Sequence, residues 1–376
     1  MKTQLLVIGA GATGMGIARD AALRGIKTIV VDKGAIGSGT SGYFHGLLHS
    51  GARYVTNDAD AARECIEENI ILKRIAPSAI HETGGLFLAI TEEDCNFAPL
   101  FYLACKAVGI PAEELSPDMV LAKEPLVNPT LKRVFSVPDG YINGKKMLEL
   151  NKLSAEKTQT PATFLEHHEV VKFLKKDSRI EAVVVKDESG EKTIECDMVI
   201  NASGIWASQI GALAGADIQM TADKGAMLVT EEKLSTAVLN RCRPPSDGDI
   251  LVPTANHSIM GTTSVKTDDI NTHVVEQWEI DRLIKEGSVM VPSMATTVIS
   301  TTYSGVRTLV GSTASTARGV SRSFKLIDHK EEGMDNLISM IGGKFTIYRK
   351  MAEVAVDAVC EKLKIESPCA TANKVM

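Results

Sequence analysis

Residues 9–14 read GAGATG and match the pattern G-x-G-x-x-G. In this pattern Gly9 permits a tight turn, Gly11 lets the backbone approach a diphosphate, and Gly14 lets a helix and a strand pack closely. The N-terminus of the following helix offers N–H groups and partial positive charge to the phosphates. Asp32, placed 18 residues after Gly14, suits an acid that binds ribose hydroxyls. These residues predict a dinucleotide site.

The residues around this motif have the pattern of a strand, a helix and a second strand. Residues 4–8 (QLLVI) are an apolar run that ends in the glycines, and residues 27–31 (KTIVV) are another that ends at Asp32. Residues 14–24 lie between them and carry many small side chains, which is typical of a closely packed helix. Together they predict a βαβ unit with a right-handed crossover.

Helical and strand patterns alternate along the rest of the chain. Residues 38–51, rich in Gly, Ser and His, and residues 116–140, with four prolines, are interpreted as connections. Helices are predicted at 59–75, 97–108, 275–286 and 346–363, and strands at 169–174, 179–186, 192–196, 198–202, 226–230, 250–252, 258–261 and 301–306.

Length and composition indicate two domains. The chain has 376 residues, of which 44% are hydrophobic, 5% are aromatic and 30 are glycine. Such a chain can bury one large core or two smaller ones, and plentiful glycine with few aromatics favours many tight turns over an all-β sandwich. We expect a mixed α/β fold, in which a Rossmann-type domain is interleaved with a domain built on a mixed β-sheet.

Charge and cysteine usage exclude several functional classes. The net charge is −6 without a concentrated run of basic residues, which argues against nucleic acid as the main ligand. No apolar stretch reaches the length of a membrane span, and the N-terminus lacks the pattern of a signal peptide. The seven cysteines are widely spaced, which predicts reduced thiols in a cytoplasmic protein and no metal site.

Three segments far apart in the sequence favour FAD over NAD. Residues 198–204 (MVINASG) read as a buried strand that ends in small residues. Residues 37–41 (GSGTS) let the backbone come close to a diphosphate, and residues 342–344 (GGK) open another helix. A simple NAD-binding domain rarely needs all three segments, whereas a flavin held along its full length does.

Several strings resemble a known enzyme family. Residues 1–51, 198–206 and 338–355 are similar to the glycine oxidase/glycerol-3-phosphate dehydrogenase group of FAD enzymes, within the D-amino-acid oxidase-like superfamily. The strings that most resemble the catalytic A subunits of anaerobic glycerol-3-phosphate dehydrogenases are 45–54 (HGLLHSGARY), 240–243 (NRCR), 249–253 (DILVP), 303–307 (YSGVR) and 342–349 (GGKFTIYR). They span nearly the whole chain in order.

The resemblance implies roles for individual residues. Arg53 and Arg307 correspond to arginines that contact the substrate, and Lys344 to a lysine near substrate and flavin. His49 and Tyr54 stand in the same string as Arg53 and are further catalytic candidates. The implied reaction is oxidation of sn-glycerol 3-phosphate to dihydroxyacetone phosphate, with hydride transfer to flavin N5 and electrons passed to a partner subunit or quinone. The planar fork of arginine suits such a phosphate.

The expected FAD-binding residues come from segments throughout the chain. They are Gly9, Gly11, Ala12, Thr13, Gly14, Asp32, Lys33, Ser38, Gly39, Thr40, His45, Gly46, Leu47, Val170, Ala202, Ser203, Gly204, Trp206, Gly305, Gly342, Gly343, Lys344, Phe345 and Thr346. The helix after Lys344 is expected to direct its positive end at the flavin pyrimidine ring.

Other functions stay open. The same cations suit a 2-hydroxy acid such as 2-hydroxyglutarate, or an amino acid, and the chain is alternatively a flavin electron-relay subunit or a plain NAD-dependent dehydrogenase. The catalytic base is not identified. His45 and His49 are four residues apart, but Gly46 stands where a zinc motif has glutamate, so zinc is not expected. We interpret residues 167–168 as an exposed strand edge, and His257 is a looser site candidate.

The sequence departs from the family in three places. Tyr43 and Phe44 replace an expected polar pair, and residues 141–146 (YINGKK) differ from a segment that usually contains proline. The resemblance also implies a cysteine-rich iron–sulfur extension, which the printed sequence does not include. We expect residues 1–80, 141–214 and 301–376 to form the FAD domain, and residues 81–140 and 215–300 the substrate domain. Peripheral membrane association through a partner is compatible with this reading.

Overall fold

Apolar strands that are buried on both faces form the centre of the first sheet. In the computed structural model, which describes residues 1–310 and 323–376, β1 (Lys2–Ile8) lies between β2 (Thr28–Val31) and β12 (Gly190–Asn201), parallel to both. Near-continuous apolar sequence is typical of strands covered on two sides. The other strands of this sheet are β9 (Thr163–Leu165), β10 (Glu169–Lys176), β11 (Arg179–Asp187), β19 (Phe324–Asp328) and β20 (Leu337–Gly342).

The parallel part of this sheet has the order β9-β2-β1-β12-β20. Three helices pack on one face of it: α1 (Ala12–Leu23), α5 (Gly144–Glu156) and α8 (Tyr348–Leu363). Small residues let them approach, since a Cβ at Gly16 would lie 2.9 Å from the ring of Tyr348. The short helix α6 (Ala207–Ala214) covers the other face beside β10. This is the βαβ arrangement predicted from residues 4–31.

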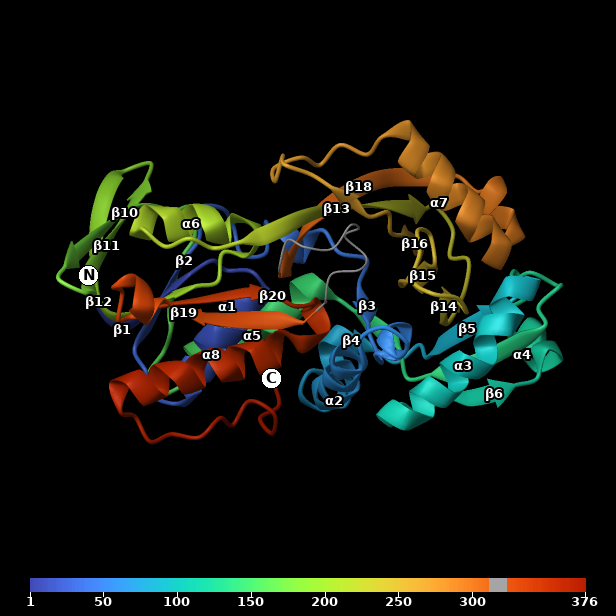
Figure 1. The fold of residues 1–376 in the computed structure, drawn as a ribbon, viewed down its shortest axis with the longest axis horizontal. Coiled ribbons are helices and arrows are strands. Elements are labelled where there is room, and N and C mark those ends of the chain that lie inside the picture. Colours follow the sequence, from blue (N-terminus) through green and yellow to red (C-terminus); the bar gives the residue numbers. More distant parts are fainter. Residues whose placement is uncertain (311–322) are drawn as a thin grey trace.

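A second, mixed sheet builds the other lobe of the molecule (Figure 1). Its order is β18-β13-β16-β15-β14-β5-β7-β6, with β17 also on β13, and β14 and β5 pair in parallel. The strands are β5 (Gly85–Ala89), β6 (Glu113–Leu115), β7 (Arg133–Val137), β13 (Met220–Thr230), β14 (Val238–Arg241), β15 (Ile250–Pro253), β16 (Ser258–Gly261), β17 (Val265–Lys266) and β18 (Ile299–Val310). The helices of this lobe are α3 (Glu92–Val108), α4 (Pro117–Lys123) and α7 (Gln277–Met290).

A small sheet and one long helix lie between the two lobes. Strands β3 (Leu47–Leu48), β8 (Gly140–Ile142) and β4 (Ile80–His81) form the small sheet, and α2 (Ala59–Ile75) lies beside it. In Figure 1, β13 and β18 run from the side of the first lobe into the second. Both lobes therefore meet around the segments that follow β1, β3 and β20.

The predicted fold class is confirmed, and most predicted elements occur. The helix over 59–75 has the predicted bounds. Helix α3 begins at Glu92, five residues before the predicted start, because Thr91 and Asp94 form a capping box there. The interpretation of residues 116–140 as connections is wrong: the segment contains α4 and β7, whose residues pack into the second core.

The domain boundaries stay a prediction, and sheet membership bears on one of them. Strand β18 pairs along its whole length with β13 in the second sheet, although the sequence grouped residues 301–306 with the FAD domain. This pairing favours a boundary after Val310 rather than at residue 301.

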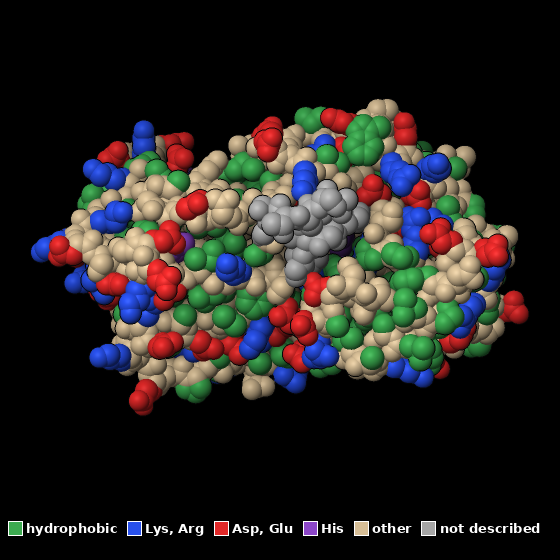
Figure 2. All heavy atoms as spheres, in the orientation of Figure 1, with side chains coloured by type: hydrophobic (Ala, Val, Ile, Leu, Met, Phe, Trp, Pro, Cys, Tyr) green, Lys and Arg blue, Asp and Glu red, His purple; other side chains and the backbone are tan. Residues whose placement is uncertain are grey.

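The surface is mixed in charge. Basic and acidic side chains alternate over the face shown in Figure 2. No helix within the described ranges has both the length and the apolar character needed to cross a membrane. All seven cysteines lie within those ranges, and they are free thiols.

Candidate active site

Parallel strand order brings the predicted segments to one edge of the first sheet. β1, β2, β12 and β20 run in the same direction, so the residues that follow them, 9–14, Asp32, 202–204 and 342–344, lie at a common edge. Ligands of open α/β sheets bind at this edge. Two cavities open there, and we name them the edge cavity, which Gly9 and Asp32 line, and the inner cavity, which Arg53 and Arg307 line.

The two cavities are continuous. Both are lined by Ala12, Thr13, Thr40, Ser41 and Gly204. Ala12 and Thr13 form the first turn of α1, which has no side-chain cap and no acidic residue. The positive end of the helix therefore stands at the junction of the cavities, where it suits the diphosphate of an extended dinucleotide.

The glycine loop has the close contacts that its motif predicts. Gly9 has a φ of +107°, and a Cβ there would lie 2.6 Å from the carbonyl oxygen of Ala202. A Cβ at Gly14 would lie 1.8 Å from the carbonyl oxygen of Gly9. The N–H of Ala12 donates to the Ser41 hydroxyl at 2.9 Å. The loop thus follows the cavity with backbone alone.

The Asp32 carboxylate holds the loops around the edge cavity. Its oxygens accept hydrogen bonds from the N–H of Ala10 at 2.7 Å and of Gly34 at 2.8 Å. Burial raises the pKa of this carboxyl, and the two N–H donors act against that rise. Nearby, the Lys33 ammonium lies 4.0 Å from the centroid of the Trp206 ring. This half of the site combines an acid with an aromatic wall, as a nucleoside requires.

Most of the expected FAD-binding residues line these two cavities. The edge cavity is lined by Gly9, Gly11, Ala12, Thr13, Asp32, Lys33, Ser38, Gly39, Thr40, Val170, Ala202, Ser203, Gly204 and Trp206. The inner cavity adds His45, Leu47, Gly342, Gly343, Lys344 and Phe345.

Four of the expected residues line neither cavity. Gly14 packs against the backbone of Gly9, and Gly46 packs against the ring of Tyr141. Gly305 packs against the backbone of Tyr43, and the Thr346 hydroxyl accepts a hydrogen bond from the N–H of His49. Their closest contacts are to protein, so they shape the site from behind.

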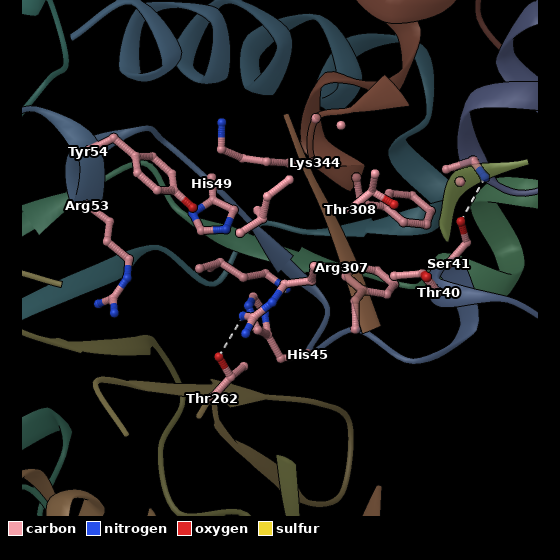
Figure 3. A pocket seen from close by; sticks show the side chains of 18 of the residues that line it. Thr40, Ser41, His45, His49, Arg53, Tyr54, Thr262, Arg307, Thr308 and Lys344 are labelled. Atoms are coloured by element: carbon pink, nitrogen blue, oxygen red, sulfur yellow. Dashed lines mark hydrogen bonds between the residues drawn. The ribbon is translucent and has the colours of Figure 1, made fainter. Parts of the chain in front are cut away.

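The two predicted arginines line the inner cavity and are fixed by buried carboxylates (Figure 3). Arg53 donates to Asp249 Oδ2 and to the Ser246 carbonyl, each at 3.0 Å. Arg307 donates to the Thr262 hydroxyl at 3.0 Å and pairs with Asp223 at 2.8 Å. The side chains of both aspartates are 0% exposed. The guanidiniums are therefore positioned before any ligand binds.

Lys344 lines the same cavity but points in another direction. Its ammonium lies 4.6 Å from the centroid of the Tyr54 ring. In Figure 3 it is directed toward α2, whereas the guanidiniums of Arg53 and Arg307 lie on the other side of His49. Burial raises the pKa of Glu64 on α2, and Lys344 acts against this rise. The structure therefore brings the three cations to one cavity without clustering their charged ends.

His45 and His49 have different surroundings. His45 Nδ1 accepts a hydrogen bond from the N–H of Leu47, so the proton of the neutral ring is on Nε2. Burial, together with Arg307 and Arg53, lowers the pKa of His45 to about 3. His45 is thus a neutral donor. The His49 ring is buried, with its centroid 5.4 Å from that of Tyr54 and 5.9 Å from that of His45.

Other sequence candidates differ from expectation. His168 is not at an exposed edge: it is half-buried, lies 3.2 Å from Asp187 and lines the edge cavity. His257 lies in the turn between β15 and β16 and lines neither cavity. The departing residue Phe44 stacks on Phe345, with ring centroids 4.4 Å apart. Within the described ranges, no three His, Cys, Asp or Glu side chains gather as a metal site.

Several residues of the site were missed. Ser41 lines both cavities, and its place in the loop 37–41 was the available signal. Asp249 begins the string 249–253, but its contact with Arg53 spans 196 positions. Asp223 and Thr262, which hold Arg307, carry no signal in the sequence. Residues that position others are found through tertiary contacts.

Comparison with known proteins agrees with this site. The family model described as FAD dependent oxidoreductase matches residues 4–339. The chain belongs to the FAD-dependent oxidoreductase family. FAD, the cofactor predicted from the glycine loop and the three distant segments, is therefore confirmed for this FAD-dependent oxidoreductase.

Individual relatives narrow the placement of this FAD-dependent oxidoreductase. The chain is 44% identical to the A subunit of anaerobic glycerol-3-phosphate dehydrogenase from Escherichia coli (strain K12) over 99% of this chain and 69% of that protein. A solved structure of glycerol-3-phosphate dehydrogenase from Bacillus halodurans, complexed with FAD, matches with a TM-score of 0.74 and 26% identity, covering 99% of this chain and 67% of that one. Glycine oxidase from Geobacillus kaustophilus shares the fold, with a TM-score of 0.79, 20% identity, and coverage of 100% and 98%. The predicted resemblance is confirmed.

Proposed function

We propose that this protein oxidises sn-glycerol 3-phosphate to dihydroxyacetone phosphate with FAD. The observation that carries the proposal is the inner cavity, in which Arg53 from the β3 side and Arg307 from the second sheet both line a space continuous with the dinucleotide site. Two fixed guanidiniums match the charge and the oxygen geometry of a phosphate monoester. The relatives named as glycerol-3-phosphate dehydrogenases support the same substrate.

The cavities fit FAD in shape and in chemistry. The glycine loop offers backbone where a Cβ would collide, the uncapped start of α1 faces the junction, and Asp32 stands in the nucleoside half. We propose that Gly9, Gly11, Asp32 and Trp206 hold the adenosine diphosphate part, and that Gly342 to Phe345 lie along the ring. When bound, FAD supplies the acceptor for the hydride that leaves C2 of the substrate.

The residues of the inner cavity have distinct proposed roles. Arg53 and Arg307 bind the phosphate and orient the substrate, which hydride transfer needs more than any single acid or base. His45 cannot be the base at neutral pH, because its Nε2 carries a proton and its pKa is about 3. It donates a hydrogen bond instead. His49, beside Tyr54, is the histidine left to accept the proton of the C2 hydroxyl. Lys344 adds positive charge above Tyr54.

The electrons have to leave to an acceptor outside this chain. The name of the Escherichia coli relative designates one component of a larger enzyme, which supports another component of such an enzyme in the role of acceptor. We propose a partner of this kind, or a quinone, as the immediate electron acceptor, with any attachment to a membrane made through the partner.

Anaerobic reduction of the purified flavoprotein tests the substrate. Addition of sn-glycerol 3-phosphate is expected to bleach the flavin band near 450 nm, while glycerol and inorganic phosphate leave it unchanged. Bleaching by 2-hydroxyglutarate or an amino acid, with no response to glycerol 3-phosphate, would refute the proposal. Reduction by a protein partner alone would indicate an electron-relay role.

A further inference from the structure

Arg53 stands at the inner end of a buried chain of alternating charges. Asp249 Oδ2 accepts from Arg53 at 3.0 Å, and Asp249 Oδ1 accepts from Arg243 at 2.7 Å. Arg243 also donates to Glu286 at 2.9 Å. The side chains of Arg53, Asp249 and Arg243 are 9%, 0% and 12% exposed. The Asp249 carboxylate is therefore shared by two arginines, of which only Arg53 lines the cavity.

The chain continues away from the cavity into two helices. Glu286 on α7 accepts from Arg241 at 2.9 Å, and Arg241 donates to Asp94 on α3 at 3.1 Å. The Asp94 side chain is 0% exposed and also caps α3. From Arg53 to Asp94 the chain has three arginines and three carboxylates, so its charges balance. Buried pairs with matched geometry are rigid, because breaking one leaves an uncompensated charge.

We infer that Asp249 is a positioning residue for substrate binding. It holds the Arg53 guanidinium through one carboxylate oxygen, while Arg243 and the N–H of Ser246 hold the carboxylate in turn. Substrate affinity is thus set partly by a side chain that does not line the cavity. This inference rests on the proposed function, in which Arg53 grips the phosphate.

A double-mutant cycle separates this role from a merely structural one. Asp249→Asn keeps the side-chain volume and removes the charge. We expect it to raise KM for glycerol 3-phosphate about tenfold while kcat changes less than about threefold, which is about 1.4 kcal/mol of binding. Arg53→Ala is expected to raise KM by more than tenfold. In the double variant KM should match that of Arg53→Ala within about twofold, because Asp249 acts through Arg53.

Independent losses would overturn the inference: a double variant near hundredfold, or a loss in kcat rather than in KM. Glu286→Gln, one step further along the chain, is expected to raise KM less than Asp249→Asn, and it replaces Asp249→Asn should that variant fail to fold. Glu114→Gln is the matched control. It breaks a bidentate contact with Arg133 at 2.7 and 3.0 Å, at the outer edge of the second sheet, and should leave KM unchanged.

A calorimetric titration keeps this result distinct from the proposed function. If the wild-type protein does not oxidise glycerol 3-phosphate, the proposed function fails, and the same cycle is read from the Kd of inorganic phosphate. Additive losses in that Kd, or no phosphate binding to the wild type, would overturn the positioning role by itself.

Discussion

Two glycines in the loop and helix that follow β1 are expected to fail for different reasons when changed to alanine. A Cβ at Gly14 would lie 1.8 Å from the Gly9 carbonyl oxygen, which is fixed backbone. A Cβ at Gly11 would lie 3.1 Å from the Ser41 hydroxyl, a side chain that can rotate. Gly14→Ala therefore disturbs the protein itself. Gly11→Ala mainly adds a methyl group to the wall of the edge cavity.

The magnitudes follow from these contacts. To accommodate Gly14→Ala, α1 has to move by more than about 1 Å, against close packing such as Gly16 on Tyr348, and overpacking of this kind costs roughly 1–3 kcal/mol or more. The melting temperature should fall by about 2–4 °C per kcal/mol. Gly11→Ala weakens one hydrogen bond to the Ser41 hydroxyl, which is worth about 1 kcal/mol.

The assay compares flavin-free and flavin-bound protein. Thermal melts of the flavin-free variants should show a loss of roughly 6 °C for Gly14→Ala and less than about 3 °C for Gly11→Ala. Titration with FAD, followed by fluorescence quenching, should show Kd raised at least about tenfold for Gly11→Ala, equivalent to about 1.4 kcal/mol. Equal melting losses in the two flavin-free variants, or unchanged FAD affinity in Gly11→Ala, would refute the reasoning.

Three further perturbations have defined outcomes. Arg307→Ala should lower kcat/KM for glycerol 3-phosphate by about 10- to 100-fold in steady-state assays, because it removes charge-assisted hydrogen bonds worth roughly 1.5–3 kcal/mol; an unchanged value would exclude Arg307 from the site. The folded pKa of His45, about 3, lies below its unfolded value of about 6.5, so stability should fall as pH drops from about 6.5 toward 3, by up to about 1.4 kcal/mol per unit. Denaturant unfolding should show a flatter slope for His45→Gln and the wild-type slope for His257→Gln; identical slopes in all three would contradict this. Glu68→Ala leaves Arg349, which is 4% exposed, without its partner on α2, and should cost about 3 kcal/mol by the same unfolding measurement, whereas an unchanged midpoint would show that Glu353 suffices.

The sequence by itself determined the local features of this protein. The glycine spacing at 9–14, the apolar runs around it and Asp32 predicted the βαβ unit and its dinucleotide, because each depends on neighbours within one turn or one strand. The helix at 59–75 was predicted to the residue for the same reason. The strings around Arg53, Arg307 and Lys344 placed these residues at one cavity through the resemblance.

Only the tertiary structure decided how the site is held together. The pairing of β18 with β13, the carboxylates behind Arg53 and Arg307, and the direction of Lys344 toward Tyr54 join residues that are far apart in the chain. A charge in the sequence has many possible partners, and burial selects one of them, since a buried charge without a partner is costly. The sequence therefore predicted which residues do the chemistry, and the fold decided what keeps them in place.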